Sequence, residues 1–448
     1  MGTKENFFYW IKKIIAFIYN DKVRIGFQQA VPFWIASVIT GLIAVFYTFL
    51  FGRAEELLAW VTEKDHAWLF IITPIGFILA YLLVAKWAPF AQGSGIPQVV
   101  ASIELATPDN TSKIDRLLGI RIIIVKILSS LLMVLSGGVI GREGPTIQIA
   151  GSVFKKINQW IPESWPKISK KNMIMTGGAA GLAAAFNTPL GGIVFAVEEL
   201  TKTHISYFKT ALFSAVIIAG LTAQAILGPY LYLGYPNLRD LDSTIFLSVG
   251  LVAIVCGMSG AILSKLILAI LKWKSQFKKE FQFILFAFFA GLLMASLAYF
   301  INPAILGSGK EQMTTLLFTE NKKVEWYMPF LRILGALVSF TSGAAGGIFA
   351  PALSIGATIG GGLANLLELS ATNTNLLVLG GMVGFLTGVT RSPFTSAILV
   401  LEMTDRHSVI FYLMLSAMLA GPAAFLIDRR SLYTHLKNRY LKLLDSTP

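Results

Sequence analysis

Three short stretches rich in glycine and proline interrupt apolar parts of this sequence. Each ends in a proline, which suits the first turn of a following helix. A helix N-terminus gathers backbone N–H groups without intrahelical partners and the positive end of the helix dipole. Three such termini pointing at one spot would bind an anion without a full positive charge. The stretches are Gly93-Ser94-Gly95-Ile96-Pro97, Gly141-Arg142-Glu143-Gly144-Pro145 and Gly347-Ile348-Phe349-Ala350-Pro351.

Glu143 is the single residue for which the sequence predicts the most specific function. A carboxylate amid apolar sequence is costly and marks a functional site by default. At a helix N-terminus it can act as a tethered anion that occupies the site in place of a mobile one. Protonation removes its charge, and the side chain can then leave. The alternative is a structural role, as a neutral group or as the ion-pair partner of Arg142.

Two further carboxylates, Glu198 and Glu199, close the apolar run 191–197. Adjacent residues on a helix point about 100° apart, so at most one of them faces a given pathway. One interpretation is a helix end at the membrane interface. The other is that one of the two passes protons between the cytoplasm and the protein interior.

The elements that carry these residues lie in a membrane. Of 448 residues, 55% are hydrophobic and 14% are charged, against about 25% charged in a soluble protein. Unwound backbone at membrane depth is tolerated only where it is buried in protein or lines a cavity. We therefore expect an all-α polytopic protein with broken and re-entrant helices. The apolar blocks are 31–51, 67–85, 120–135, 173–197, 207–228, 244–271, 282–302, 329–341, 375–386 and 408–427.

The net charge of +13 does not indicate nucleic-acid binding, because Lys and Arg cluster at the termini and in loops between apolar blocks. This is the pattern of the positive-inside rule. It predicts cytoplasmic termini and an even number of crossings. Residues 1–30 are expected to form an amphipathic helix on the cytoplasmic leaflet.

Cysteine and histidine give no sign of a metal or cofactor site. The single cysteine, Cys256, excludes an internal disulfide and a Cys-rich metal site. The histidines are scattered without an i, i+4 pair, and we expect no cofactor and no metal. They are His66, His204, His407 and His435.

The chain repeats itself at an offset of about 200 residues, which predicts two homologous halves. Gly93-Ser94-Gly95 is echoed by Gly307-Ser308-Gly309, the second stretch by the third, and Pro189 with Glu198 by Pro393 with Glu402. Halves with an odd number of helices must insert in opposite orientations, which is the inverted-repeat plan of secondary transporters. The expected repeats are 31–237 and 244–427, followed by a basic cytoplasmic tail over 428–448.

The three stretches, together with GLAAAFNTPLGGIVFAVEEL at 181–200, resemble the CLC family of chloride channels and chloride/proton exchangers, in its prokaryotic form without CBS domains. The likeness runs from about residue 30 to about residue 435. It implies a homodimer in a bacterial inner membrane, with one anion pathway per subunit. It also implies chloride ligands at Ser94, the backbone of Ile348 and Phe349, and Tyr433 of the tail.

Within this resemblance, Glu143 matches the family's gating glutamate, which also accepts protons. Glu199 matches the internal proton-transfer glutamate that exchangers keep and channels lack, and this favours exchange of chloride for protons. Ser94 fits chloride, since the family's nitrate carriers resemble this site with proline there. The sequence departs from relatives at Gln98, Val100 and Ala345, which weakens inference about an accessory proton route.

Three alternatives stay open at this point. The nearest is a passive chloride channel of the same fold. From another class, Gly257-Met258-Ser259-Gly260 fits the pattern of an intramembrane serine protease, although small residues also serve close helix packing. The third is an ATP-driven pump, since Gly307-Ser308-Gly309-Lys310 is similar to part of a phosphate-binding loop, but Ala304 and Glu311 stand where that loop needs Gly and Ser or Thr. We therefore do not expect an enzyme.

Overall fold

The computed structural model describes residues 21–107, 110–201, 209–228, 231–239, 241–242, 244–320 and 322–446. In these ranges the chain is helical apart from short connections and two isolated β-bridges. Nine helices of the described chain are long and apolar enough to cross a membrane, by length and composition. The prediction of an all-α, multi-pass membrane protein is confirmed.

The first half of the chain begins with one long helix. Residues 1–20 of the expected interfacial helix lie outside the described residues, and the first described helix starts at Asp21 and continues across the expected boundary at residue 31. The helices of this half are α2 (Asp21–Lys64), α3 (Leu69–Trp87), α4 (Ile96–Glu104), α5 (Thr111–Leu117), α6 (Ile120–Leu135), α7 (Glu143–Gln159), α8 (Lys170–Phe186), α9 (Pro189–Phe195) with a π-helical turn at Ala196–Leu200, and α10 (Lys209–Leu227).

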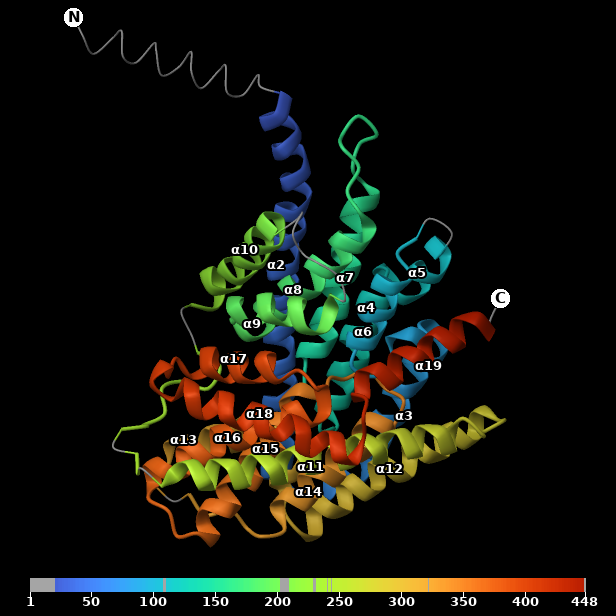
Figure 1. Cartoon of the computed structure of the whole chain (residues 1–448). Coiled ribbons are helices and arrows are strands. Elements are labelled where there is room, and N and C mark those ends of the chain that lie inside the picture. Colours follow the sequence, from blue (N-terminus) through green and yellow to red (C-terminus); the bar gives the residue numbers. More distant parts are fainter. Residues whose placement is uncertain are drawn as a thin grey trace, which may run out of the picture.

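The second half repeats this order of long and short helices, except that α5 has no counterpart. Its members are α11 (Ile245–Lys274), α12 (Glu280–Phe300), α13 (Lys310–Phe318), α14 (Met328–Thr341), α15 (Phe349–Leu366), α16 (Ala371–Thr390), α17 (Pro393–Thr404) and α18 (Ile410–Ile427). The tail forms α19 (Leu432–Ser446), which returns to pack on α4 of the first half. Figure 1 shows α19 beside α4.

The repeat is visible in the local backbone as well as in the order of helices. Short helices α4 and α13 have nine residues each, and both start after a glycine in the left-handed region, Gly95 with φ 103° and Gly309 with φ 86°. Helices α8 and α16 both end at a left-handed residue, Asn187 and Arg391. A proline at the first turn then starts α9 and α17.

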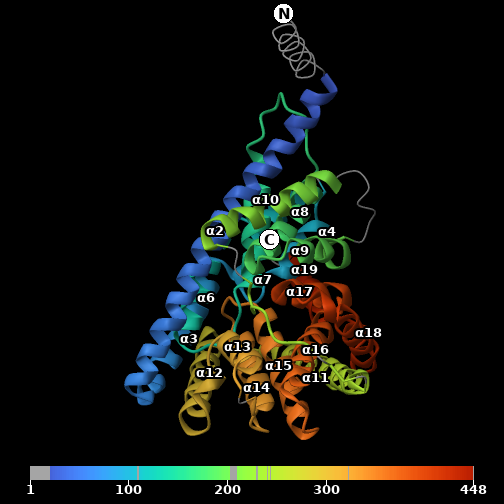
Figure 2. The same ribbon diagram turned by 90° about the vertical axis from the view of Figure 1, so that its left-hand side faces the viewer.

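The two halves form two bodies that meet at the broken helices. In Figures 1 and 2 the blue-to-green helices of the first half lie against the yellow-to-red helices of the second half. Helix α7 starts at this junction and contacts α15. Breaks in the helices therefore lie where the halves face each other, and this arrangement positions the candidate site.

Small residues let the helices of the second half approach closely. An added Cβ at Gly257 would overlap the backbone of Ala420, and one at Gly260 would overlap the backbone of Phe385 and Gly388. These contacts explain the glycines that flank Ser259, because close approach of membrane helices requires small residues. The packing role leaves the protease interpretation of this motif without structural support.

Candidate anion pathway

The three Gly/Pro stretches come together through backbone hydrogen bonds. The Gly93 N–H donates to the carbonyl of Ala344 at 2.9 Å, and the Gly93 carbonyl accepts from Gly346 N–H at 3.0 Å. Gly141 and Gly347 exchange two further bonds, of 2.8 and 2.7 Å. These bonds satisfy backbone groups that unwound chain would otherwise leave unpaired in a membrane. They also hold the starts of α4, α7 and α15 at one place.

Glycine is required in this cluster by close approach. A Cβ on Gly144 would overlap the Ser94 hydroxyl, and a Cβ on Gly347 would lie 3.0 Å from the Gly141 carbonyl and 3.1 Å from the Gly144 nitrogen. Backbone N–H groups can face a shared space only if side chains stay out of it. In the described chain, the N–H groups of Ile348 and Phe349 donate no hydrogen bond within the protein.

Ser94 and Tyr433 supply two hydroxyl groups to this place from opposite ends of the sequence. Each residue is 1% exposed, and neither hydroxyl has a hydrogen-bond partner in the structure. The Tyr433 ring stacks on Phe349, with ring centres 6.3 Å apart, and the hydroxyl lies near enough to Ser94 to interact with it. Buried polar groups normally have a partner, and two adjacent hydroxyls without one are suited to donate hydrogen bonds to an anion.

Glu143 is the first residue of α7 and is 1% exposed. One of its carboxylate oxygens, Oε2, is buried without a hydrogen-bond partner. The carboxylate lies beside the backbone of Gly141 and Ala350, at the start of α15. No ion pair joins it to Arg142 in the described chain, since that guanidinium donates a long bond of 3.4 Å to the Thr48 carbonyl. The structure therefore does not show the Arg142-paired arrangement, and the role of Glu143 as a tethered anion stays a prediction.

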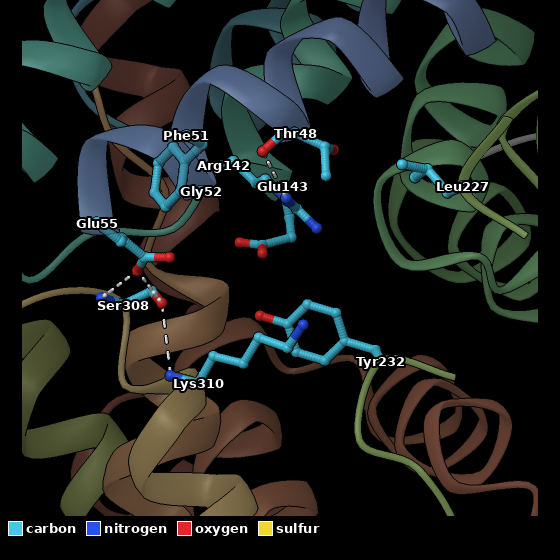
Figure 3. Close-up of a pocket in the computed structure, with 10 residues that line it drawn as sticks. All are labelled: Thr48, Phe51, Gly52, Glu55, Arg142, Glu143, Leu227, Tyr232, Ser308 and Lys310. Carbon is cyan, nitrogen blue, oxygen red and sulfur yellow. Dashed lines mark hydrogen bonds between the residues drawn. The ribbon is translucent and has the colours of Figure 1, made fainter. Parts of the chain in front are cut away.

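A cavity opens on each side of this cluster. The first has a volume of about 250 Å³ and is shown in Figure 3; we call it the Glu55 cavity. It is lined by Thr48, Phe51, Gly52, Glu55, Arg142, Glu143, Leu227, Tyr232, Ser308 and Lys310. The second, the Glu199 cavity, has about 280 Å³ and is lined by Val100, Glu198, Glu199, Thr390, Arg391, Arg429, Arg430, Ser431, Tyr433, Thr434 and Lys437. Glu143 faces one cavity and Tyr433 the other.

The adjacent carboxylates Glu198 and Glu199 diverge, as the helical spacing predicts. Glu198 accepts hydrogen bonds from the N–H groups of Phe394 and Thr395 at 3.1 and 2.7 Å, and so caps α17. Glu199 accepts one from the Ser392 hydroxyl at 2.9 Å. Both line the Glu199 cavity, but only Glu198 caps a helix.

Two buried basic side chains support the site, and sequence reasoning missed both. Lys126 on α6 donates to the carbonyls of Ala91 and Gly93, each at 2.8 Å. Arg332 on α14 donates to the Ile305 carbonyl at 2.8 Å and to the Ser354 hydroxyl at 2.7 Å. Both are fully buried. The two residues are 206 positions apart, which is close to the repeat offset, so an alignment of the two halves could have identified them as a pair.

The departures from relatives have structural partners. The Gln98 amide donates to the carbonyls of Phe90 and Gln92 at 3.0 and 2.7 Å. Val100 contributes an apolar wall to the Glu199 cavity. The Ala345 N–H donates to the Ser129 hydroxyl at 3.0 Å. The described residues also contain no cluster of three His, Cys, Asp or Glu side chains able to hold a metal.

The sequence profile of the voltage gated chloride channel family matches residues 75–423, which include Ser94, both expected glutamates and the third stretch. The chain belongs to this family, commonly called CLC. Its relatives are transporters rather than enzymes, which agrees with the expectation from the sequence.

Curated relatives of this CLC protein match it over nearly its whole length. The H(+)/Cl(-) exchange transporter ClcA of Salmonella typhi is 29% identical over 97% of this chain and 95% of the relative. The ClcA transporter of Salmonella typhimurium is 28% identical with the same coverage.

Solved CLC structures share the fold. A slow cyanobacterial Cl−/H+ antiporter superposes with a TM-score of 0.81 at 23% identity, covering 94% of this chain and 99% of the other. A CLC-type fluoride/proton antiporter has a TM-score of 0.73 at 22% identity, over 90% and 96% of the two chains. The inverted-repeat prediction is thereby confirmed at the level of fold.

Proposed function

We propose that this protein exchanges chloride for protons across the membrane as a secondary active transporter. The observation that carries the proposal is the position of Glu143, a buried carboxylate at the meeting point of three helix starts. One cavity approaches it directly, and a second one ends at Tyr433 on the far side of the cluster. The exchange activity named for the Salmonella relatives supports the same proposal.

Chloride binds between Ser94 and Tyr433 in this mechanism. The two hydroxyls and the N–H groups of Ile348 and Phe349 all donate hydrogen bonds, and none of them carries a full charge. Partial positive charge of this kind stabilises an anion while leaving it free to depart, as conduction requires. Charged Glu143 competes for the adjacent position at the start of α15 and α7.

Protons travel by a route that joins the chloride pathway at Glu143. Chloride approaching this position repels the charged carboxylate. Once Glu143 is protonated, it no longer competes for the position. Glu199 lines the cavity on the Tyr433 side, where it can exchange protons with water. Because chloride and the proton use Glu143 at different moments, movement of one is coupled to movement of the other.

A passive chloride channel of this fold is the second candidate. The same anion ligands and the same gate serve both functions, so the pathway itself does not separate them. Glu199 favours exchange, since a channel has no use for an internal proton donor. The protein would act as a homodimer with cytoplasmic termini in a bacterial inner membrane. In that orientation the Glu199 cavity opens to the cytoplasm and the Glu55 cavity to the outside.

The test uses purified protein in chloride-loaded liposomes, with chloride efflux and external pH recorded together. We expect chloride efflux to drive proton uptake against the proton gradient. Rapid chloride efflux without proton movement would identify a channel instead. Absence of chloride flux would remove both candidates. Cross-linking and mass measurement of the same sample test the dimer.

A further inference from the structure

The second repeat contains a counterpart of the Ser94 site. Gly307-Ser308-Gly309 lies at the start of α13, as Gly93-Ser94-Gly95 lies at the start of α4. The flanking glycines have the same left-handed backbone, with φ of 65° and 103° in the first loop and 70° and 86° in the second. The two loops therefore share the same backbone conformation at both glycines.

An anionic side chain occupies the second loop. The Ser308 hydroxyl donates to Glu55 Oε1 at 2.7 Å, and the Ser308 N–H points to the same oxygen at 3.3 Å. Ser308 is 5% exposed, whereas Glu55 comes from α2, which is not part of the repeat motif. Figure 3 shows these bonds at the edge of the Glu55 cavity. A carboxylate thus sits where the first loop leaves its serine hydroxyl without a partner.

Three basic side chains surround this loop, and none of them forms an ion pair with Glu55 in the described chain. The Lys310 ammonium lies 4.9 Å from the centre of the Tyr232 ring, and in the described chain no carboxylate comes within ion-pair distance of it. Among the described residues, the Arg142 guanidinium makes only its long bond to Thr48, and the buried Arg332 lies directly behind the loop, bonded to the Gly307 carbonyl at 3.3 Å. In Figure 3 the Lys310 ammonium and the Glu143 carboxylate both point into the cavity.

We propose that Ser308 and Lys310, with Arg142, form a second anion site in the Glu55 cavity, at which Glu55 is a tethered competitor. Its ligand is a small inorganic anion such as chloride, and the identification with chloride rests on the proposed function. An anion that replaces the Glu55 carboxylate keeps the charge of the cavity unchanged. The Ser308 hydroxyl and N–H then donate hydrogen bonds to this anion, and the Lys310 ammonium can approach it.

The site would lie next to the gate, because Glu143 lines the same cavity. Chloride bound at Ser308 can move to the position beside Glu143. Glu55 limits how long chloride stays at Ser308, because its carboxylate competes for the same donors. The arrangement mirrors Ser94 and Glu143, in which a mobile anion and a carboxylate contend for adjacent positions. The charged groups that face Glu55 across the cavity are Arg142, which directly precedes α7, Glu143 at the start of α7 and Lys310 from α13, with Arg332 behind the loop from α14.

The experiment measures equilibrium chloride binding to the purified, intact protein by titration calorimetry from chloride-free buffer. Glu55→Ala removes the competitor, and we expect it to bind one more chloride per chain than wild type. Adding Ser308→Ala or Lys310→Met to that variant should remove the gain. Lys64→Met is the matched control, because Lys64 also stacks on an aromatic ring, Trp60, but does not line the cavity; added to Glu55→Ala, it should leave the gain intact.

Bromide-soaked crystals of Glu55→Ala give an independent measurement by anomalous scattering. A peak beside Ser308 and Lys310 supports the proposal. It is overturned if Glu55→Ala, shown to be monodisperse, binds the same number of chlorides as wild type and shows no bromide there; Glu55 is then only a cap on α13. Wild-type protein that binds no chloride at all contradicts the proposed function instead, so the two failures are distinct.

Discussion

Glu198 and Glu402 each cap the helix on which the other stands. Glu402, on α17, accepts from the N–H groups of Leu190 and Gly191 at 3.0 and 2.6 Å. Glu198, in the turn that continues α9, does the same for the first N–H groups of α17. The two caps are related by the repeat, and they tie the halves together beside Glu199.

Removing either cap should lower the stability of the protein. Replacing a side chain that caps a helix by alanine costs about 0.5–2 kcal/mol, so we expect Glu402→Ala and Glu198→Ala each to lower the unfolding midpoint in detergent by a few degrees. The control is Glu56→Ala, which removes an exposed ion pair with Arg53 and should change little. Equal midpoints for Glu402→Ala and Glu56→Ala would contradict a capping role.

Glu143→Ala should abolish proton coupling and preserve chloride flux. The change removes both the competing carboxylate and the proton carrier, while the Ser94 and Tyr433 hydroxyls remain. Glu143→Gln, which imitates the protonated side chain, should uncouple transport in the same way. Both are measured by the paired chloride and pH recordings in liposomes. Proton uptake that persists in either variant means that another residue carries the proton.

Glu199→Gln should also uncouple chloride from protons, for a different reason: the path to the Glu199 cavity loses its titratable group. Glu198→Gln is a matched control one residue away, because its amide oxygen can still accept the bonds from α17. We expect coupling to survive in the control. Loss of coupling in both variants would point to a shared structural effect, and coupling retained in Glu199→Gln would assign the route elsewhere.

Ser94→Ala and Tyr433→Phe should weaken chloride binding at the central site. Each removes one hydroxyl donor, and a hydrogen bond of this kind contributes about 0.5–1.5 kcal/mol, or roughly a 2- to 12-fold change in Kd. Titration calorimetry measures the change. Tyr440→Phe is the control, since that buried hydroxyl is already bonded to the Gln92 carbonyl at 3.1 Å. Unchanged affinity in Tyr433→Phe would exclude it as a ligand.

Asp428 should make the segment that carries Tyr433 sensitive to acid. Burial acts to raise its pKa, but the Arg430 N–H and the His435 ring stabilise the charged carboxylate and hold the pKa of Asp428 below its ordinary value. A carboxyl with a lowered pKa contributes stability above its unfolded pKa of about 4, which is lost as pH falls through the folded value.

We therefore expect the unfolding midpoint of wild type to fall on acidification below about pH 4, and that of Asp428→Asn to depend less on pH in this window. The control is Asp405→Asn, whose pair with His407 is exposed. An identical pH profile for wild type and Asp428→Asn would show that the interaction contributes nothing.

The membrane setting, the repeat and the three helix starts can all be predicted from the order of the amino acids. Apolar blocks and the scarcity of charge follow directly from the need to face lipid. Gly-rich stretches ending in proline indicate a broken helix through their residue types alone, because few other residues permit the backbone or the first turn. Glu143 stood out for the same local reason, as a carboxylate in apolar sequence.

Which groups meet depends instead on how the helices pack. The tail residue Tyr433 reaches Ser94 because α19 packs on α4, and nothing in the residues around Tyr433 specifies that partner. The assignment of Glu198 to capping and Glu199 to the cavity likewise depends on where α17 begins. Lys126, Arg332 and the Glu55–Ser308 pair were not predicted, since their partners are backbone carbonyls or residues about 250 positions away.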